Sequence, residues 1–208
     1  MINLYNKDCI IALKEMQDNQ FDLAIVDPPY GLDFAKTYTK RTKKDRMGLR
    51  HKSKEWDEGV PKDEFFIELQ RVSKNQIVWG GNYFPYLWKN ACKGFIFWYK
   101  GNPVPNFSDG ELAWTSFNKV AQQFDYRYYG NLEGNTSTLT KIHPTQKPVS
   151  LYEWLLMNYA KEGDKILDTH LGSGSIAIAC HNLGFDLEAY ELDKEYFEAA
   201  NKRLKQHQ

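Results

Sequence analysis

The stretch that decides the fold runs from Lys165 to Glu191 and reads KILDTHLGSGSIAIACHNLGFDLEAYE. It begins with a short apolar segment, passes through glycines at 172 and 174, and then shows apolar residues at helical spacing. A second apolar segment follows at 187–192. A strand, a glycine turn, a helix and another strand in this order are typical of the nucleoside-binding half of a doubly wound α/β fold.

The charged residues beside this loop indicate the class of ligand. Asp168 precedes the glycines, and Glu191 follows Gly172 by about 20 residues, a distance at which an acid can accept hydrogen bonds from a ribose. A carboxylate at 168 would repel a phosphate and would suit a cationic group. S-adenosylmethionine has an ammonium group, a ribose and no phosphate, so we expect it as the cofactor. The alternative is a glycine turn that binds no ligand.

A second constellation, Asp27-Pro28-Pro29-Tyr30, ends the compact apolar segment 21–26. Such a segment is typical of a buried parallel strand, and ligands of open parallel sheets bind at the carboxyl ends of strands. The carboxylate of Asp27 and the carbonyl of Pro28 can both accept hydrogen bonds from one amino group, which favours methyl transfer to an aromatic amine. Tyr30 offers a flat face to a base flipped out of a duplex. The alternative is a proline-stiffened turn without chemistry.

The rest of the chain alternates between strand and helix patterns, which predicts a mostly parallel sheet covered on both faces. We expect one domain over 1–208. Two stretches depart from the pattern: a basic loop at about 32–60, which we expect to be mobile, and a polar, aromatic stretch at about 118–142, interpreted as a small DNA-recognition insertion. Further strands are expected at 1–5, 76–80, 94–99 and 111–117, and helices at 9–16, 61–72, 151–159, 176–183 and 194–204.

The net charge is zero, with 27 basic and 27 acidic residues, so the distribution of charge matters more than its sum. Nine lysines and arginines fall between Lys36 and Lys54, where Asp45 is the only acid. We expect this run to contact DNA phosphates, with Lys43, Lys44 and Arg46 as the candidate residues. The alternative is a solvated loop.

The cysteines at 9, 92 and 180 are far apart and lack metal-site spacing, so they predict neither a metal site nor a disulfide framework. The N-terminus has no apolar signal core, and no stretch approaches the roughly 20 apolar residues that span a bilayer. We therefore expect a cytoplasmic protein that needs no metal and no membrane.

Together these segments resemble the beta group of DNA amino-methyltransferases, in particular the small adenine methyltransferases of phages and prophages. Asp27-Pro28-Pro29-Tyr30 resembles the catalytic motif of that group, and 168–175 (DTHLGSGS) resembles its glycine motif. The segment 143–148 (HPTQKP) is similar to the one that precedes the cofactor strand, and Asp8-Cys9 resembles the segment that lines the cofactor's adenine. The catalytic motif comes first and the cofactor motif last, as in the circularly permuted members.

The resemblance implies a Rossmann-like methyltransferase fold with a mostly parallel, seven-stranded sheet whose last two strands, 94–99 and 111–117, form an antiparallel hairpin. It implies double-stranded DNA as the substrate and a homodimer as a common assembly. Thr169 and His170 replace the usual Pro and Phe. His170 either lines the cofactor pocket or is a core histidine, and we expect the latter. The residues implied to surround the cofactor are Asp8, Cys9, Asp27, His143, Thr145, Gln146, Lys147, Asp168, Gly172, Ser173, Gly174 and Glu191.

The predicted function is therefore site-specific methylation of the exocyclic N6 of a flipped adenine, with Asp27, Pro28, Pro29 and Tyr30 as the catalytic residues, within a restriction-modification or phage setting. Three alternatives stay open. Methyltransferases of the cytosine N4 amine usually have Ser in place of Asp27. RNA and protein amino-methyltransferases usually have the opposite motif order, with the glycine motif before the catalytic motif. A non-catalytic binder would show damaged motifs, whereas those of this chain are intact.

Overall fold

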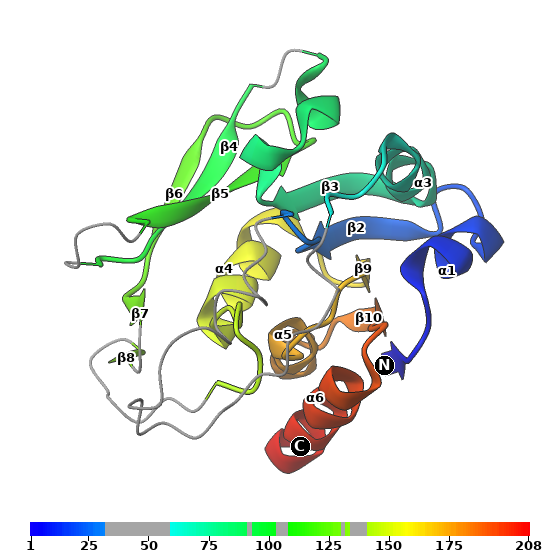
Figure 1. The fold of residues 1–208 in the computed structure, drawn as a ribbon, viewed down its shortest axis with the longest axis vertical. Helices are drawn as coiled ribbons and strands as arrows, with labels where there is room; N and C mark the ends of the chain where they lie inside the picture. Colours follow the sequence, from blue (N-terminus) through cyan, green and yellow to red (C-terminus); the bar gives the residue numbers. More distant parts are fainter. Residues whose placement is uncertain (32–58, 91–92, 103–107, 130–131, 134–140) are drawn as a thin grey trace.

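The computed structural model describes residues 1–31, 59–90, 93–102, 108–129, 132–133 and 141–208. Its centre is an eight-stranded sheet with the strand order β1-β10-β9-β2-β3-β5-β4-β6 (Figure 1). The strands from β1 to β3 in this order pair in parallel, and β5 pairs antiparallel with both β3 and β4. The strands are β1 (Ile2–Tyr5), β2 (Phe21–Val26), β3 (Ser73–Trp79), β4 (Phe95–Tyr99), β5 (Gly110–Thr115), β6 (Gln122–Asp125), β9 (Lys165–Asp168) and β10 (Asp186–Tyr190).

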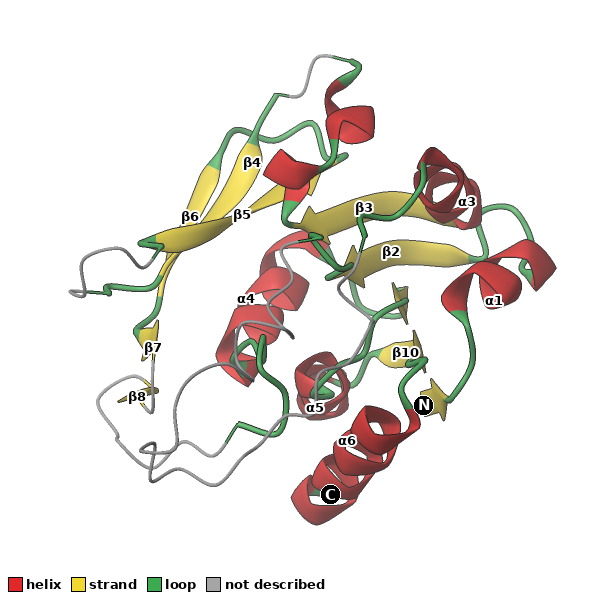
Figure 2. Ribbon diagram, viewed as in Figure 1, coloured by secondary structure: helices red, strands yellow, loops and turns green. Residues whose placement is uncertain are grey.

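Helices cover both faces of the sheet, and each face has its own apolar core (Figure 2). Alternate residues of a strand point to opposite faces, so β2 sends Leu23 and Ile25 into one core and Ala24 and Val26 into the other. The first core is closed by α4 (Val149–Tyr159), α5 (Ser175–Leu183) and α6 (Lys194–His207), and the second by α1 (Cys9–Glu15) and α3 (Asp63–Val72).

Two helices begin at a side-chain cap next to the edge where the parallel strands end. Asp8 accepts hydrogen bonds from the amides of Ile10 and Ile11 at the start of α1, and Asp193 accepts from Glu195 and Tyr196 at the start of α6. Such caps satisfy amides that a helix leaves unpaired. The caps therefore fix the loops after β1 and β10 at the carboxyl edge of the sheet.

The predicted strand count is wrong, because the sheet in the described residues has eight strands rather than seven. The two segments predicted as a terminal hairpin form β4 and β5, which pair antiparallel from Phe95↔Trp114 to Tyr99↔Gly110, but they do not end the sheet. β6 pairs parallel with β4 and lies in the stretch interpreted as an insertion. Only Phe124 of β6 packs against the core, so its sequence, QQFD, has no apolar run that would predict a strand.

The remaining short elements are the 3₁₀ turns η2 (Gly81–Tyr83) and η3 (Pro85–Trp88) and the two-stranded pair β7 (Tyr128–Tyr129) and β8 (Leu132–Glu133). Of the loop predicted at 32–60, the structure describes only residues 59 and 60. Among the described helices, none combines the length and the hydropathy that crossing a bilayer requires.

Candidate active site

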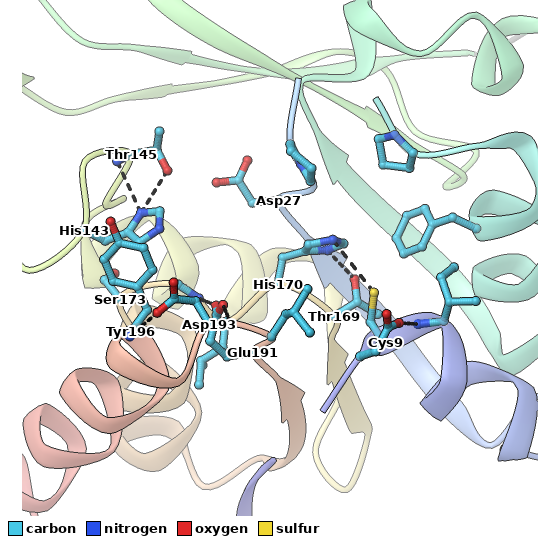
Figure 3. Close-up of a pocket in the computed structure, with 18 of the residues that line it drawn as sticks. Cys9, Asp27, His143, Thr145, Thr169, His170, Ser173, Glu191, Asp193 and Tyr196 are labelled. Carbon is cyan, nitrogen blue, oxygen red and sulfur yellow. Dashed lines mark hydrogen bonds between the residues drawn. The ribbon is translucent and has the colours of Figure 1, made fainter. Parts of the chain in front are cut away.

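A cavity of about 680 Å³ opens where β2, β9 and β10 end, within the size range of small-molecule sites (Figure 3). Neighbouring parallel strands end at the same edge, so loops that are far apart in the sequence meet there. Four residues of the predicted site, Pro28, Tyr30, Asp168 and Gly174, do not line the cavity. The predicted residues that do line it are Asp8, Cys9, Asp27, Pro29, His143, Thr145, Gln146, Lys147, Gly172, Ser173 and Glu191.

Glu191 ties the glycine loop to the loop after β10. One of its carboxylate oxygens accepts a hydrogen bond from the Gly172 amide and the other accepts from the Asp193 amide, both at 2.8 Å. Gly172 has a φ of +53°, a left-handed conformation that favours glycine. Glu191 itself lines the cavity.

Asp27 is held by two donors. The hydroxyl of Tyr30 donates to Asp27 Oδ1 at 2.5 Å, and the ammonium of Lys147 bonds to Asp27 Oδ2. Lys147 Nζ also lies 3.1 Å from Glu111 Oε2, and Glu111 pairs with Lys100 on its other side. Two acids and two lysines thus alternate along one chain of contacts, in which the side chain of Lys147 is only 2% exposed.

The charges of this network stabilise one another. Burial opposes the charged form of Lys147, but Asp27 and Glu111 outweigh it and hold the pKa of the ammonium above its usual value. Burial likewise opposes ionisation of Glu111, but Lys147 and Lys100 outweigh it and lower its pKa to about 2. Burial and the neighbouring Asp27 raise the pKa of Tyr30, so its hydroxyl stays protonated and remains a donor.

The cavity wall is rich in acceptors. Among the described residues it carries five acids and two lysines, and one of these lysines is Lys147, already engaged by Asp27. Apolar side chains, including Phe65 and Leu171, complete the lining. This wall suits a ligand that brings hydrogen-bond donors and positive charge, and it is unsuited to a phosphate. No group of three potential metal ligands occurs among the described residues.

Comparison with known proteins identifies the family. Residues 34–202 match the family model for N6/N4 DNA methylases. The chain is 30% identical to the type II methyltransferase M.HpaI of Haemophilus parainfluenzae, over 95% of this chain and 72% of that protein. It is 28% identical to M2.DpnII of Streptococcus pneumoniae, over 97% and 88%. The chain belongs to the DNA methylase family.

Solved structures share the fold of this DNA methylase. The complex of M1.HpyAVI with S-adenosylmethionine superposes with a TM-score of 0.65 at 24% identity, over 98% of this chain and 100% of that one. The PvuII cytosine-N4-specific DNA methyltransferase superposes with a TM-score of 0.64 at 15% identity, over 97% and 86%. The α/β methyltransferase fold predicted from the motifs is thereby confirmed, in a version with a mixed sheet.

His170 lies in the cavity wall of the methylase, so the expectation of a core histidine is wrong. Its Nδ1 lies 2.8 Å from Thr169 Oγ1, its Nε2 lies 3.9 Å from Cys9 Sγ, and its ring meets Phe65 edge-on (Figure 3). Burial lowers the pKa of His170 to about 4, so the ring is neutral near pH 7. The chain turns after β9, and this turn directs the His170 ring into the cavity. The spacing of apolar residues in the sequence does not predict the turn.

Asp168 lies behind the cavity wall. It is 2% exposed, and its Oδ1 accepts a hydrogen bond from the His170 amide at 2.9 Å. Burial raises the pKa of its carboxyl to about 8. Gly174, the other glycine of the loop, is the N-cap residue before α5, and a Cβ there would lie 3.1 Å from the Cβ of Ala200. Both residues thus shape the loop from the side away from the cavity.

Sequence reasoning missed Glu111 and Lys100, which complete the network around Lys147. The available signal was a single acid in an otherwise apolar strand, GELAWT. Trp98 and Trp114 are buried. The three candidate DNA contacts, Lys43, Lys44 and Arg46, lie outside the described residues.

Proposed function

We propose that this DNA methylase transfers the methyl group of S-adenosylmethionine to the exocyclic N6 of a flipped adenine at specific sites in double-stranded DNA. The observation that carries the proposal is the position of Asp27. Its carboxylate follows a central parallel strand, borders the cavity and is held by the Tyr30 hydroxyl and the Lys147 ammonium. A carboxylate fixed in this way is a preorganised acceptor for an amine.

The cavity residues fit S-adenosylmethionine. Asp8 uses Oδ1 to cap α1, so its second oxygen can accept from the adenine amine of the cofactor. Glu191 lines the cavity at the end of β10, and an acid in this position can accept hydrogen bonds from ribose hydroxyls. The excess of acids in the wall favours a ligand with a sulfonium and an ammonium group over a nucleotide. S-adenosylmethionine supplies an electrophilic methyl group to this site.

The chain's own part in the reaction is to prepare the amine. Asp27 and the Pro28 carbonyl each accept one hydrogen bond from N6, which localises the nitrogen lone pair. Both acceptors interact more strongly as positive charge develops on N6, so they stabilise the transition state more than the ground state. Tyr30 orients Asp27 through its hydroxyl and offers its ring to the flipped base.

Methylation of the cytosine N4 amine is the second candidate, because a cytosine-N4-specific enzyme has the same fold. The fold therefore does not discriminate between the two bases. The resemblance to adenine enzymes lies in Asp27, where cytosine-N4 enzymes usually have Ser. We accordingly place adenine first.

The test is nucleoside analysis of methylated DNA. Plasmid DNA lacking N6-methyladenine is incubated with the purified protein and S-adenosylmethionine. It is then digested to nucleosides, which are identified by mass spectrometry. N6-methyl-2′-deoxyadenosine is the expected product. Asp27→Ala should reduce turnover by at least about a hundredfold while cofactor affinity measured by calorimetry changes little, and the exposed Glu162→Ala serves as the control. N4-methylcytosine as the product would replace the adenine assignment, and absence of both would overturn the proposal.

A further inference from the structure

The catalytic tyrosine is already stacked on another tyrosine. The rings of Tyr30 and Tyr83 have their centroids 5.0 Å apart and their planes inclined by 17°. Tyr30 follows β2, and Tyr83 ends the 3₁₀ turn η2 that follows β3. β2 and β3 are parallel neighbours, so the two loops meet at the carboxyl edge of the sheet.

The neighbours of the Tyr30 ring differ in their freedom to move. Phe84 packs edge-on against it at 6.1 Å and is 2% exposed. Gly80 is buried and so close that a Cβ there would lie 2.1 Å from Tyr30 Cε1. Tyr83 is 39% exposed, and its hydroxyl makes no hydrogen bond to any described residue. Exposed side chains change rotamer within nanoseconds, so Tyr83 is the neighbour that can leave the ring.

A target base needs the place that Tyr83 occupies. The Tyr30 hydroxyl lies 2.5 Å from Asp27 Oδ1, so a base stacked directly on Tyr30 brings its amino group close to Asp27. A base stacked on the outer side of Tyr83 would lie one more ring spacing away, roughly 4.5–7 Å between centroids. That distance exceeds hydrogen-bond reach of Asp27. Since Gly80 and Phe84 are fixed, a base can reach only the face of the Tyr30 ring that Tyr83 now covers.

We propose that Tyr83 is the second stacking residue of the base site. It covers Tyr30 while the site is empty, moves aside when the base enters, and then stacks on the base from the side opposite Tyr30. The inference rests on the proposed function and adds a specificity-determining residue to it. The clamp selects a flat aromatic ring because both of its faces must meet a tyrosine ring.

Matched variants separate this role from a structural one. Tyr83→Ala removes the ring, Tyr83→Phe keeps it, and Tyr83→Leu keeps apolar cover without an aromatic face. Tyr5→Ala is the control, because Tyr5 stacks on Tyr190 at 5.1 Å and 21° and is 40% exposed, nearly the same geometry and exposure. Tyr5 lies in the edge strand β1, which β10 and β9 separate from β2 and the loop that carries Tyr30.

The experiment first maps the adenine that the wild type methylates in plasmid DNA, and then replaces it with 2-aminopurine in a short duplex. 2-Aminopurine fluoresces when unstacked and is quenched between aromatic rings. We expect a quenched complex for wild type, Tyr83→Phe and Tyr5→Ala, and brighter complexes for Tyr83→Ala and Tyr83→Leu. On unmodified duplex, kcat/KM should fall roughly five- to a hundredfold for Tyr83→Ala, with unchanged affinity for S-adenosylmethionine.

The outcomes are distinguishable. Equal fluorescence and equal kcat/KM for wild type and Tyr83→Ala would show that Tyr83 does not touch the base. A higher kcat/KM for Tyr83→Ala would show that Tyr83 only blocks the face, which also overturns the clamp. If Tyr83→Ala melts below the assay temperature, Tyr83→Leu decides by the same criteria. A wild type that methylates no adenine overturns the proposed function, and the clamp with it.

Discussion

The ammonium of Lys147 contacts the carboxylate of Asp27, although 120 positions separate the two residues in the chain. Lys147 comes from the segment before α4. Its other partner, Glu111, comes from β5, which β3 separates from β2, the strand before the catalytic loop. The predicted cofactor segment and the predicted catalytic segment are therefore joined by one ion-pair network around the buried Lys147. We therefore expect the stability of the fold, and the proposed catalysis, to depend on that network.

Lys147→Met should destabilise the fold by about 3–5 kcal/mol, the usual cost of removing one partner from a buried ion pair. The variant keeps most of the length of the side chain but leaves two carboxylates without their shared cation. Urea denaturation at pH 7 measures the free energy of unfolding. Lys74→Met is the matched control, because the Lys74–Asp22 pair lies at the surface with Lys74 55% exposed, and such pairs contribute at most about 1 kcal/mol.

A double-mutant cycle with Glu111→Gln tests whether the network acts as a unit. In the Glu111→Gln background, Lys147→Met leaves one unpaired carboxylate instead of two, so its cost should be smaller. If the losses in the free energy of unfolding of the two single variants add up to that of the double variant within about 0.5 kcal/mol, Glu111 and Lys147 are independent.

Glu191→Gln should weaken the binding of S-adenosylmethionine about ten- to a hundredfold, because hydrogen bonds to a charged group contribute about 1.5–3 kcal/mol. Glu188→Gln, three positions earlier in the chain, is the control, since Glu188 does not line the cavity. Isothermal calorimetry gives both affinities. Equal affinities for the two variants would remove Glu191 from the ribose site.

The two segments that determine the site were predictable because each is local. Asp27-Pro28-Pro29-Tyr30 ends one buried strand, and the glycine loop follows another, so both had to lie at the carboxyl edge of a parallel sheet. Their adjacency depends on the pairing of β2 with β9, which the structure shows and the local sequence patterns do not predict. The permuted motif order, the single-domain organisation and the homodimer stay predictions.

The parts that sequence reasoning missed depend on tertiary contacts. β6 has too few apolar residues to read as a strand, and it is held by backbone pairing with β4 and by the Trp98 indole, which donates to the Tyr126 carbonyl. Glu111 looks like an ordinary polar residue in a strand until Lys147 is placed beside it. The sequence left open whether His170 lies in the core or lines the cofactor pocket, and only the tertiary structure places it in the cavity wall.

The basic run at 36–54 carries the prediction for DNA binding. If Lys43, Lys44 and Arg46 neutralise phosphates, changing all three to Ala should weaken binding to every DNA sequence alike. The slope of log affinity against log salt should also flatten by about 0.9 for each phosphate that the variant no longer neutralises. Fluorescence anisotropy on two unrelated duplexes between low and moderate salt measures both effects. An unchanged slope would identify the run as a solvated loop.

Asp168 should make the stability of the protein depend on pH. Burial raises the pKa of its carboxyl from 3.8 to about 8 in the folded state, with smaller contributions from Asp27 and Glu191 in the same direction and from the His170 amide and Lys147 in the opposite one. Between these values the folded state keeps a proton that the unfolded state has lost. The free energy of unfolding therefore falls as pH rises from about 4 to about 8, and this contribution is constant outside that window.

Asp168→Asn tests both the sign of this effect and the role of Asp168 toward the cofactor. The amide can still accept from the His170 amide but cannot ionise, so the variant's stability relative to wild type should increase with pH by at most about 1.4 kcal/mol per unit. Denaturation curves at pH 5, 6, 7 and 8 measure the difference, and parallel curves would show that the carboxyl titrates normally.

If Asp168 pairs with the cofactor ammonium, Asp168→Asn should also weaken S-adenosylmethionine binding about ten- to a hundredfold. Wild-type binding at pH 7 should then release a proton, because the ammonium favours the charged carboxylate; calorimetry in buffers of different ionisation enthalpy detects it. Unchanged affinity and no proton release would confine Asp168 to shaping the loop that carries His170.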